Sequence, residues 1–285
     1  MKRSIKAIIA TAGAAFMCAV PTVSTIADTT ITNNITASAA SYAPGIPMAN
    51  VYSNNANGKI FVTKEAGLLY KMTSEGNGKW EVAFCGVASA QPKAVVDDKI
   101  NVGGVIYNVT SIASNAFNDC PNARLDEFDF SKATQITSIP ARAFKNGAVE
   151  SIVLPPNLTT IGDEAFLGAK WLKSIEVPQY VTSVGTKAFK DCIRLNTIRF
   201  ERPANSYRAL ILKHQSFANC TGLRYITNNV TSFKDINRNN GQVIAESSAD
   251  AFSGVTKSNV SVGTTYRHIG WKEQYVNNFK NYFGF

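Results

Sequence analysis

The sequence predicts a β-rich solenoid of the α/β class, in which each coil contributes one short strand. Three observations support this fold class: a recurring Ala-Phe pair (Ser-Phe in one copy), a Leu-x-x-Ile-x-Val segment after most pairs, and Pro or Gly next to these segments. The Phe residues are 27, 22, 23, 28 and 35 residues apart, at Phe117, Phe144, Phe166, Phe189, Phe217 and Phe252. A unit of this size buries its apolar face only by stacking on its neighbours.

The Leu-x-x-Ile-x-Val segment predicts the strand of each coil. Alternation along a strand turns every second side chain toward the core, and Pro155, Pro178 and Pro203 end strands by removing a backbone donor. The predicted strands are residues 125–130, 149–154, 172–177, 195–200 and 223–228, and the predicted inward side chains are Phe128, Phe130, Ile152, Leu154, Ile175, Val177, Ile198 and Phe200.

A second, shorter extended segment precedes the Ala-Phe pair, at residues 159–162 and 182–185. We expect Gly162 and Gly185 to supply a turn with positive φ at its end. The Ala-Phe segment is too short for a stable helix, so it predicts a helical turn or irregular arc that places the Phe ring in the core.

The N-terminal end of the chain differs from the repeats. Residues 1–27 predict a signal peptide, because a cationic start is followed by an apolar stretch and a small-residue cleavage site. Lipidation of Cys18 is the alternative, although Met17 stands where a small residue would be expected. Residues 28–58, rich in Thr, Asn, Ser and Ala, predict a flexible tether. Residues 59–110 predict an N-terminal β cap of short strands.

The remainder divides into the repeats and a final cap. Residues 111–262 are the predicted solenoid of about six coils, and residues 263–285 are the predicted C-terminal cap. Aromatic residues recur every four positions in that cap, which predicts a helix with one aromatic face: Trp271, Tyr275, Phe279 and Phe283. We expect this helix to seal the last coil, with a membrane-surface helix as the alternative.

Charge and hydropathy limit the classes of partner. The formal net charge is +9, of which the predicted leader contributes three charges. Cations are densest between residues 187 and 213, where we expect a solvated face; a preference for anionic partners is the alternative. These spaced cations are not concentrated into the continuous basic surface that binds nucleic acid. Outside the leader, no apolar run reaches the roughly 18 residues that a membrane span needs. We therefore expect no nucleic-acid partner and no integral membrane span.

Three cysteines occupy one position of the repeat, three residues after the Phe: Cys120, Cys192 and Cys220. Gly147, Ala169 and Val255 occupy the same position elsewhere, so it predicts a small buried site in which a free thiol packs as an apolar group. Stacked coils would bring Cys192 and Cys220 within reach of a disulfide, and export would permit one. We expect free thiols, because an inward-pointing parallel stack rarely gives good disulfide geometry.

The sequence contains no recognisable catalytic, cofactor or metal motif. His214 and His268 are its two histidines, and neither has the spacing of a metal site or a catalytic triad. The adjacent carboxylates Asp97-Asp98 and Asp163-Glu164 should point apart, unlike a glycosidase pair. We therefore expect no enzyme, no cofactor and no bound metal.

The outward positions of the predicted strands should align into a polar row across successive coils. This row changes from acidic to basic and aromatic, and it includes Glu127, Asp129, Ser174, Glu176, Thr197, Arg199, Tyr225 and Thr227. One interpretation is an ordinary polar sheet face. The other is a shallow protein-binding strip with Arg199 and Tyr225 as anchors, because Arg and Tyr are enriched among binding hot spots.

The repeat resembles a known family. Residues 182–198, TSVGTKAFKDCIRLNTI, and residues 159–166, TTIGDEAF, are similar to the BspA-like leucine-rich repeat family. The resemblance covers residues 105–255 in several in-phase copies, and residues 67–73 resemble the first strand of such proteins. Departures are the extended loops at residues 205–212 and 237–247.

This resemblance implies a leucine-rich repeat solenoid from a bacterial secreted or cell-surface protein of the kind associated with adhesion. The resulting expectation is an exported, non-enzymatic protein that binds a protein ligand of a host or neighbouring cell through its sheet face. The alternatives are a structural spacer at the cell surface and a secreted hydrolase with an unrecognised site.

Overall fold

The structure is a computed structural model that describes residues 47–55, 58–63, 67–76, 78–88, 92–116, 125–203, 208–236, 242–265 and 269–285. The predicted signal peptide, most of the predicted tether, and the predictions for Phe117, Cys120 and His268 lie outside the described residues.

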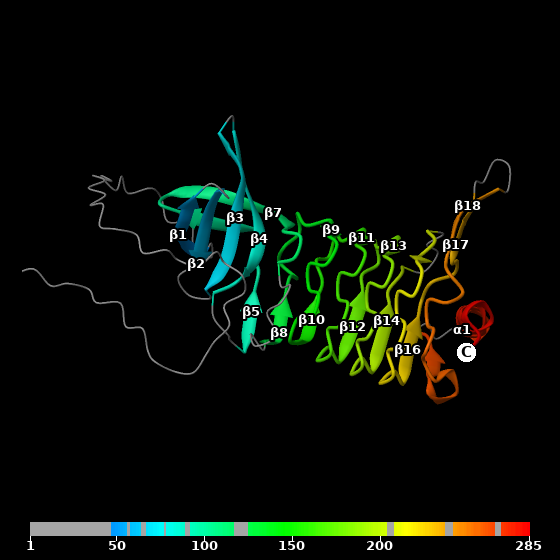
Figure 1. Ribbon diagram of the computed structural model, residues 1–285. Helices are drawn as coiled ribbons and strands as arrows, with labels where there is room; N and C mark the ends of the chain where they lie inside the picture. Colours follow the sequence, from blue (N-terminus) through cyan, green and yellow to red (C-terminus); the bar gives the residue numbers. More distant parts are fainter. Residues whose placement is uncertain are drawn as a thin grey trace, which may run out of the picture.

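The N-terminal unit is a closed barrel at one end of the molecule (Figure 1). Its strands, in barrel order, are β1 (Met48–Asn55), β2 (Gly58–Thr63), β3 (Leu68–Gly76), β4 (Lys79–Val87), β7 (Val105–Ile112) and β6 (Lys99–Val102). Phe61, Tyr70 and Phe84 are buried in it. The Phe84 ring lies 5.4 Å from that of Phe128 in the solenoid, so the two cores are continuous.

The predicted tether is wrong at residues 48–55, which form β1. This strand pairs antiparallel with β2 and places Met48 and Ala49 beside β6 in a parallel pairing. Its Asn- and Ser-rich sequence has no apolar alternation, and backbone pairing with two neighbours stabilises it instead. The β unit therefore begins at residue 48, not at residue 59.

The repeats form a seven-stranded parallel sheet that runs along the molecule. Its strands are β5 (Lys93–Val95), β8 (Leu125–Asp129), β10 (Val149–Val153), β12 (Ser174–Val177), β14 (Thr197–Phe200), β16 (Tyr225–Asn228) and β19 (Ser261–Gly263). The five predicted strands are confirmed, and all eight predicted inward side chains are buried. The structure adds β5, which comes from the barrel segment and begins the sheet, and β19, which ends it.

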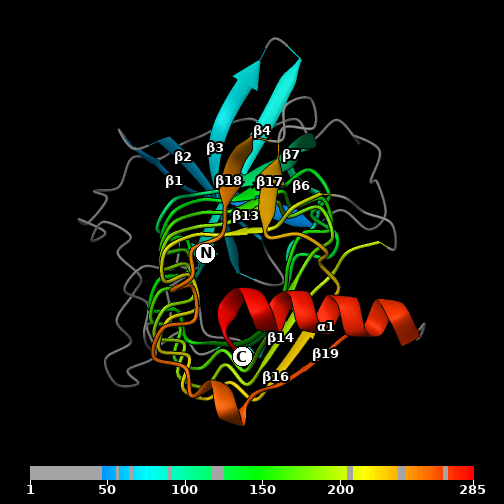
Figure 2. The same ribbon diagram turned by 90° about the vertical axis from the view of Figure 1, so that its right-hand side faces the viewer.

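A second, four-stranded parallel sheet forms another wall of the coils, as the view along the solenoid shows (Figure 2). Its strands are β9 (Ser138–Ile139), β11 (Thr160–Ile161), β13 (Ser183–Val184) and β15 (Ile211–Leu212). A separate antiparallel hairpin follows β16 and rises beside this sheet: β17 (Lys234–Ile236) and β18 (Val243–Glu246). A short 3₁₀ helix, η1 (Lys257–Asn259), precedes β19.

The Phe rings of successive arcs form a buried column. Neighbouring ring centroids from Phe144 to Phe166 and from Phe166 to Phe189 are 4.9 and 4.8 Å apart, with planes within 5° of parallel. The column continues through Phe217 to Phe252 at 4.9 and 5.3 Å, so the extended loops leave the stacking intact. The layered core predicted from the repeat is confirmed.

The predicted role of Gly162 and Gly185 is wrong. Neither has positive φ; that conformation occurs two residues later, at Glu164 (55°) and Lys187 (55°). These glycines are required by close packing, because a Cβ atom on Gly162 would lie 2.7 Å from the backbone nitrogen of Ala141.

The C-terminal helix α1 (Ile269–Phe283) covers the last coil (Figure 2), as the aromatic spacing predicts. Tyr275, Phe279 and Phe283 are buried, and the Phe279 ring lies 5.6 Å from that of Phe252 at the end of the column. The Trp271 side chain lies outside the described positions.

Cys192 and Cys220 are buried free thiols. Each donates a hydrogen bond of 3.2 Å to the carbonyl oxygen of the Phe in the preceding coil, Phe166 for Cys192 and Phe189 for Cys220. Burial raises the pKa of both thiols. The expectation of free thiols therefore holds for this pair.

Candidate binding surfaces

The predicted site residues come together in two neighbouring rows on the outer face of the seven-stranded sheet. Strand register aligns Ser174 with Thr197 and Thr197 with Tyr225, and it aligns Glu176 with Arg199. The first row is Glu127, Ser151, Ser174, Thr197 and Tyr225, and the second is Asp129, Val153, Glu176, Arg199 and Thr227. We call these two rows the sheet-face strip.

The middle of the strip is hollow. Ser151, Ser174 and Thr197 have short side chains, and a depression of about 360 Å³ lies over them, bounded also by Val153 and Arg199. Short hydroxyl side chains in register leave room above the backbone that longer neighbours enclose. A protruding side chain of a partner could enter this space.

Two exposed apolar side chains accompany the hollow. Tyr225 keeps 57% of its surface exposed and Val153 keeps 42%. An exposed Tyr near such a depression combines contact area with a hydroxyl that can hydrogen bond, which is a common composition of protein interfaces.

The charges of the strip are already partly paired within the chain. The Arg199 guanidinium contacts Glu201 at 2.5 Å and Glu176 at 3.9 Å. At the other end the ammonium of Lys93 donates to Glu127 at 2.8 Å, and this hydrogen bond raises the pKa of Lys93. Sequence reasoning missed Lys93, because nothing in its segment indicated that β5 joins this sheet.

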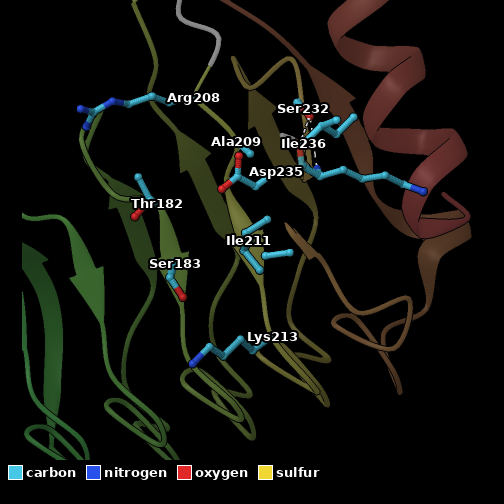
Figure 3. Close-up of a pocket in the computed structure, with 11 residues that line it drawn as sticks. Thr182, Ser183, Arg208, Ala209, Ile211, Lys213, Ser232, Asp235 and Ile236 are labelled. Atoms are coloured by element: carbon cyan, nitrogen blue, oxygen red, sulfur yellow. Dashed lines mark hydrogen bonds between the residues drawn. The ribbon is translucent and has the colours of Figure 1, made fainter. Parts of the chain in front are cut away.

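A larger hollow lies on another flank, between the small sheet and the β17–β18 hairpin (Figure 3). It has a volume of about 770 Å³. Its lining comes from the outer face of the small sheet, the segments next to β15, and the hairpin: Thr182, Ser183, Arg208, Ala209, Ile211, Lys213, Ser232, Lys234, Asp235, Ile236 and Ala245. We call it the hairpin groove. The cation-rich stretch at residues 187–213 was its only signal in the sequence.

One histidine–carboxylate pair lies in the part of the chain that the structure describes: His214 Nδ1 is 2.6 Å from Asp250. The nearby hydroxyl of Ser248 donates to Asp250 rather than to the imidazole. The adjacent carboxylates Asp163 and Glu164 point apart as predicted: Asp163 accepts from the Thr186 backbone, whereas Glu164 accepts from Arg142.

Within the part of the chain that the structure describes, no group of three or more His, Cys, Asp or Glu side chains is placed to hold a metal ion. No helix of that part has the length and apolar character to cross a membrane.

Comparison with known protein families identifies the type of the repeats. The family model described as "BspA type Leucine rich repeat region" matches residues 103–224 in six copies. No curated protein matches the chain.

Among solved structures, the pneumococcal vaccine antigen PcpA aligns with a TM-score of 0.54 and 20% identity, over 74% of this chain and 51% of that protein. A leucine-rich repeat protein from Bacteroides ovatus aligns with a TM-score of 0.39 and 24% identity, over 56% of this chain and 45% of that one. The chain thus spans about half the length of these two proteins, and the likeness to PcpA concerns the fold. The repeat region of this chain, residues 103–224, is a leucine-rich repeat region of the BspA type.

Proposed function

We propose that this chain is an exported, non-enzymatic binding protein that recognises a protein partner through the sheet-face strip. The observation that carries the proposal is the hollow of about 360 Å³ over the short hydroxyl side chains Ser151, Ser174 and Thr197, next to the exposed ring of Tyr225 and the charges of the strip. Repeat proteins commonly use such an extended, continuous surface for partners.

We expect Tyr225 and Arg199, at the C-terminal end of the strip, to contribute most to the affinity for the partner. Tyr225 supplies a large side chain that loses little conformational freedom on binding. Arg199 is half-exposed and forms an ion pair with Glu201 through its Nε, so the outer part of its guanidinium remains for an incoming acceptor. Intramolecular pairing lowers the attraction of Arg199 for an acidic partner, and Tyr225 is therefore the stronger anchor of the two.

The cell-surface role rests on the repeat type and on the predicted signal peptide at residues 1–27. Both support a location outside the cell, where a host or neighbouring-cell protein is the ligand and adhesion is the outcome. The fold alone assigns no ligand, since one fold serves many functions.

A binding screen on purified, immobilised matrix, mucin and serum proteins tests this function. We expect at least one of them to retain the protein, and we expect the double variant Arg199→Ala, Tyr225→Ala to weaken that binding at least about tenfold. Tyr180→Ala is the matched control, because Tyr180 is 42% exposed and lies outside the strip.

Unchanged affinity of the double variant would show that the strip is not the site. Failure of the whole panel to retain the wild-type protein would favour the spacer role, in which the sealed solenoid holds other parts at a distance.

A further inference from the structure

We propose that the hairpin groove is a second binding site, separate from the sheet-face strip, for an extended polypeptide segment that carries acidic side chains. The groove is lined by residues of the small sheet and the hairpin. These elements lie on a different flank of the solenoid from the seven-stranded sheet (Figure 2). The two sites therefore do not compete for the same surface.

The floor of the groove suits an extended chain. Ser183 aligns with Ile211 across β13 and β15, and these two side chains with Thr182 line the floor (Figure 3). The floor thus offers hydroxyl groups beside an apolar patch. A segment in β conformation turns alternate side chains to one side, so it can place apolar and polar groups over such a floor.

The far wall of the groove is a braced hairpin. Asp235 pairs with Ala245 across β17 and β18, and the Asp235 carboxylate points toward the groove. Lys234 pairs with Glu246 at 2.7 Å, and the hydroxyl of Tyr282 in α1 donates to Glu246 at 2.7 Å. The hairpin is therefore anchored to α1 on the side away from the groove, and the small Ala245 side chain leaves the groove open.

The charges of the groove select the ligand. Arg208 and Lys213 are exposed, and within the described residues neither forms an ion pair. Lys234 is already neutralised by Glu246, so the described lining of the groove presents Arg208 and Lys213 against the carboxylate of Asp235. An acidic side chain gains a charge-assisted hydrogen bond from Arg208 or Lys213.

Asp235 argues for a peptide rather than a polyanion. A strand of nucleic acid carries a phosphate at every nucleotide and would meet this carboxylate with like charge. A peptide with spaced acidic residues can present a backbone N–H or a hydroxyl to Asp235 and its carboxylates to the two cations. The apolar side chain of Ile236, which is 45% exposed at the hairpin, adds a contact for an aliphatic residue of the same segment.

A display library of random linear peptides, selected on the full-length protein, tests the proposal. We expect the selected peptides to be enriched in spaced Asp and Glu beside aliphatic residues. A synthetic copy of the best peptide should bind at least about tenfold more weakly to the variant Arg208→Gln, Lys213→Gln, and its affinity should fall with salt. The same peptide with Asn and Gln in place of its acids should lose a similar factor.

Two control variants distinguish binding in the groove from attraction to the overall positive charge and from binding at the sheet-face strip. Lys79→Gln, Lys99→Gln removes the same charge from the exposed surface of the barrel and should leave binding unchanged. Arg199→Ala, Tyr225→Ala alters the sheet-face strip and should also leave it unchanged, so that failure of one site is distinguishable from failure of the other. Selected peptides without acidic enrichment, full affinity of the groove variant, or equal binding of a single-stranded oligonucleotide would overturn the proposal.

Discussion

Gly162 and Gly185 are tightly packed positions in the coils, and their role is contact, not conformation. A Cβ atom at Gly185 would lie 2.5 Å from the backbone nitrogen of Asp163 in the previous coil, and Gly162 is similarly enclosed. The positive-φ positions that follow these two glycines are filled by Glu164 and Lys187, and backbone hydrogen bonds between coils hold both residues there. The N–H of Glu164 donates to Thr186 at 2.8 Å, and that of Lys187 donates to His214 at 2.9 Å.

Gly162→Ala should therefore destabilise the protein by about 1–3 kcal/mol, because the added methyl group meets backbone atoms that cannot rotate away. Gly263→Ala is the matched control: a Cβ atom there has no neighbour within 4 Å and φ is not in the left-handed region. Urea denaturation of the two variants measures the difference in the free energy of unfolding. Equal stability of both variants would contradict the packing role of Gly162.

The buried thiols give a second prediction at this scale. Burial and the missing solvation of the thiolate raise the pKa of Cys192 and Cys220, so both should resist iodoacetamide in the native protein at about pH 8. In denaturant without reductant both should be alkylated, which peptide mass spectrometry detects. Protection of the pair in denaturant would instead reveal a disulfide, and rapid alkylation of the native protein would contradict the burial.

Elements in this fold are held by contacts that cross from coil to coil. The insertion after β14 illustrates this, since the buried Arg202 donates to the carbonyl oxygens of Gln179, Val181 and Ala209 and thereby fastens one coil to the next. The hairpin and α1 are fastened in the same way through Glu246, which accepts from Lys234 and from Tyr282. These polar contacts compensate for the small apolar surface that the hairpin buries.

The hairpin–helix contact should depend on pH. Hydrogen bonds from Lys234, and then from Tyr282, lower the pKa of Glu246 below its ordinary value of 4.5. A carboxyl group whose pKa is lowered by folding stabilises the folded state above its unfolded pKa, and this contribution disappears as the pH falls through the folded pKa. The stability difference between wild type and Glu246→Gln should thus be constant above about pH 5 and shrink below about pH 4.5.

Thermal denaturation of both proteins across this pH range measures that difference. Asp235→Asn, on the groove side of the same hairpin, is the control and should show no comparable loss. An undiminished difference at about pH 3 would mean that the charge of Glu246 does not stabilise the contact.

At the scale of the whole molecule, repetition determines what the sequence can predict. The five repeat strands, their inward side chains and the Phe column follow from patterns that recur in phase, so each copy supports the others. The sealing helix follows from its own four-residue aromatic spacing. β1 and β5 have no such support: one is polar and Asn-rich, and the other is three residues long within the barrel segment. They are specified by pairing with distant strands, which a local pattern does not contain.

The candidate site was predictable to the same extent. Alternation and register identified the members of the sheet-face strip, such as Ser174 and Arg199, because both depend on the repeat. The ion pairs of Arg199 with Glu201 and of Glu127 with Lys93 were not predicted, since they depend on side-chain conformation and on the position of β5. The hairpin groove was missed because its wall is the β17–β18 hairpin, which is not part of the repeat pattern.

A solenoid whose coils are equivalent should tolerate the removal of one whole coil. Excision of residues 163–185 joins Gly162 to Thr186 and restores the pattern Gly-x-x-Ala-Phe, since Phe166 and Phe189 are 23 residues apart. Phe189 would then stack on Phe144, and β14 would pair with β10. We expect a protein that still unfolds cooperatively, with a melting temperature lowered by a few degrees, because one interface between coils replaces two.

Excision of residues 163–173 is the informative contrast. It removes Phe166 and the rest of the Ala-Phe segment but keeps β12. The column of Phe rings then lacks one ring, and β12 is no longer preceded by the segment that positions it in the sheet. Circular dichroism during heating should show a cooperative transition for the full-coil excision and none for the partial one. Cooperative folding of both would mean that the coils are not held by the Phe column, whereas loss of folding in both would mean that the coils are not interchangeable units.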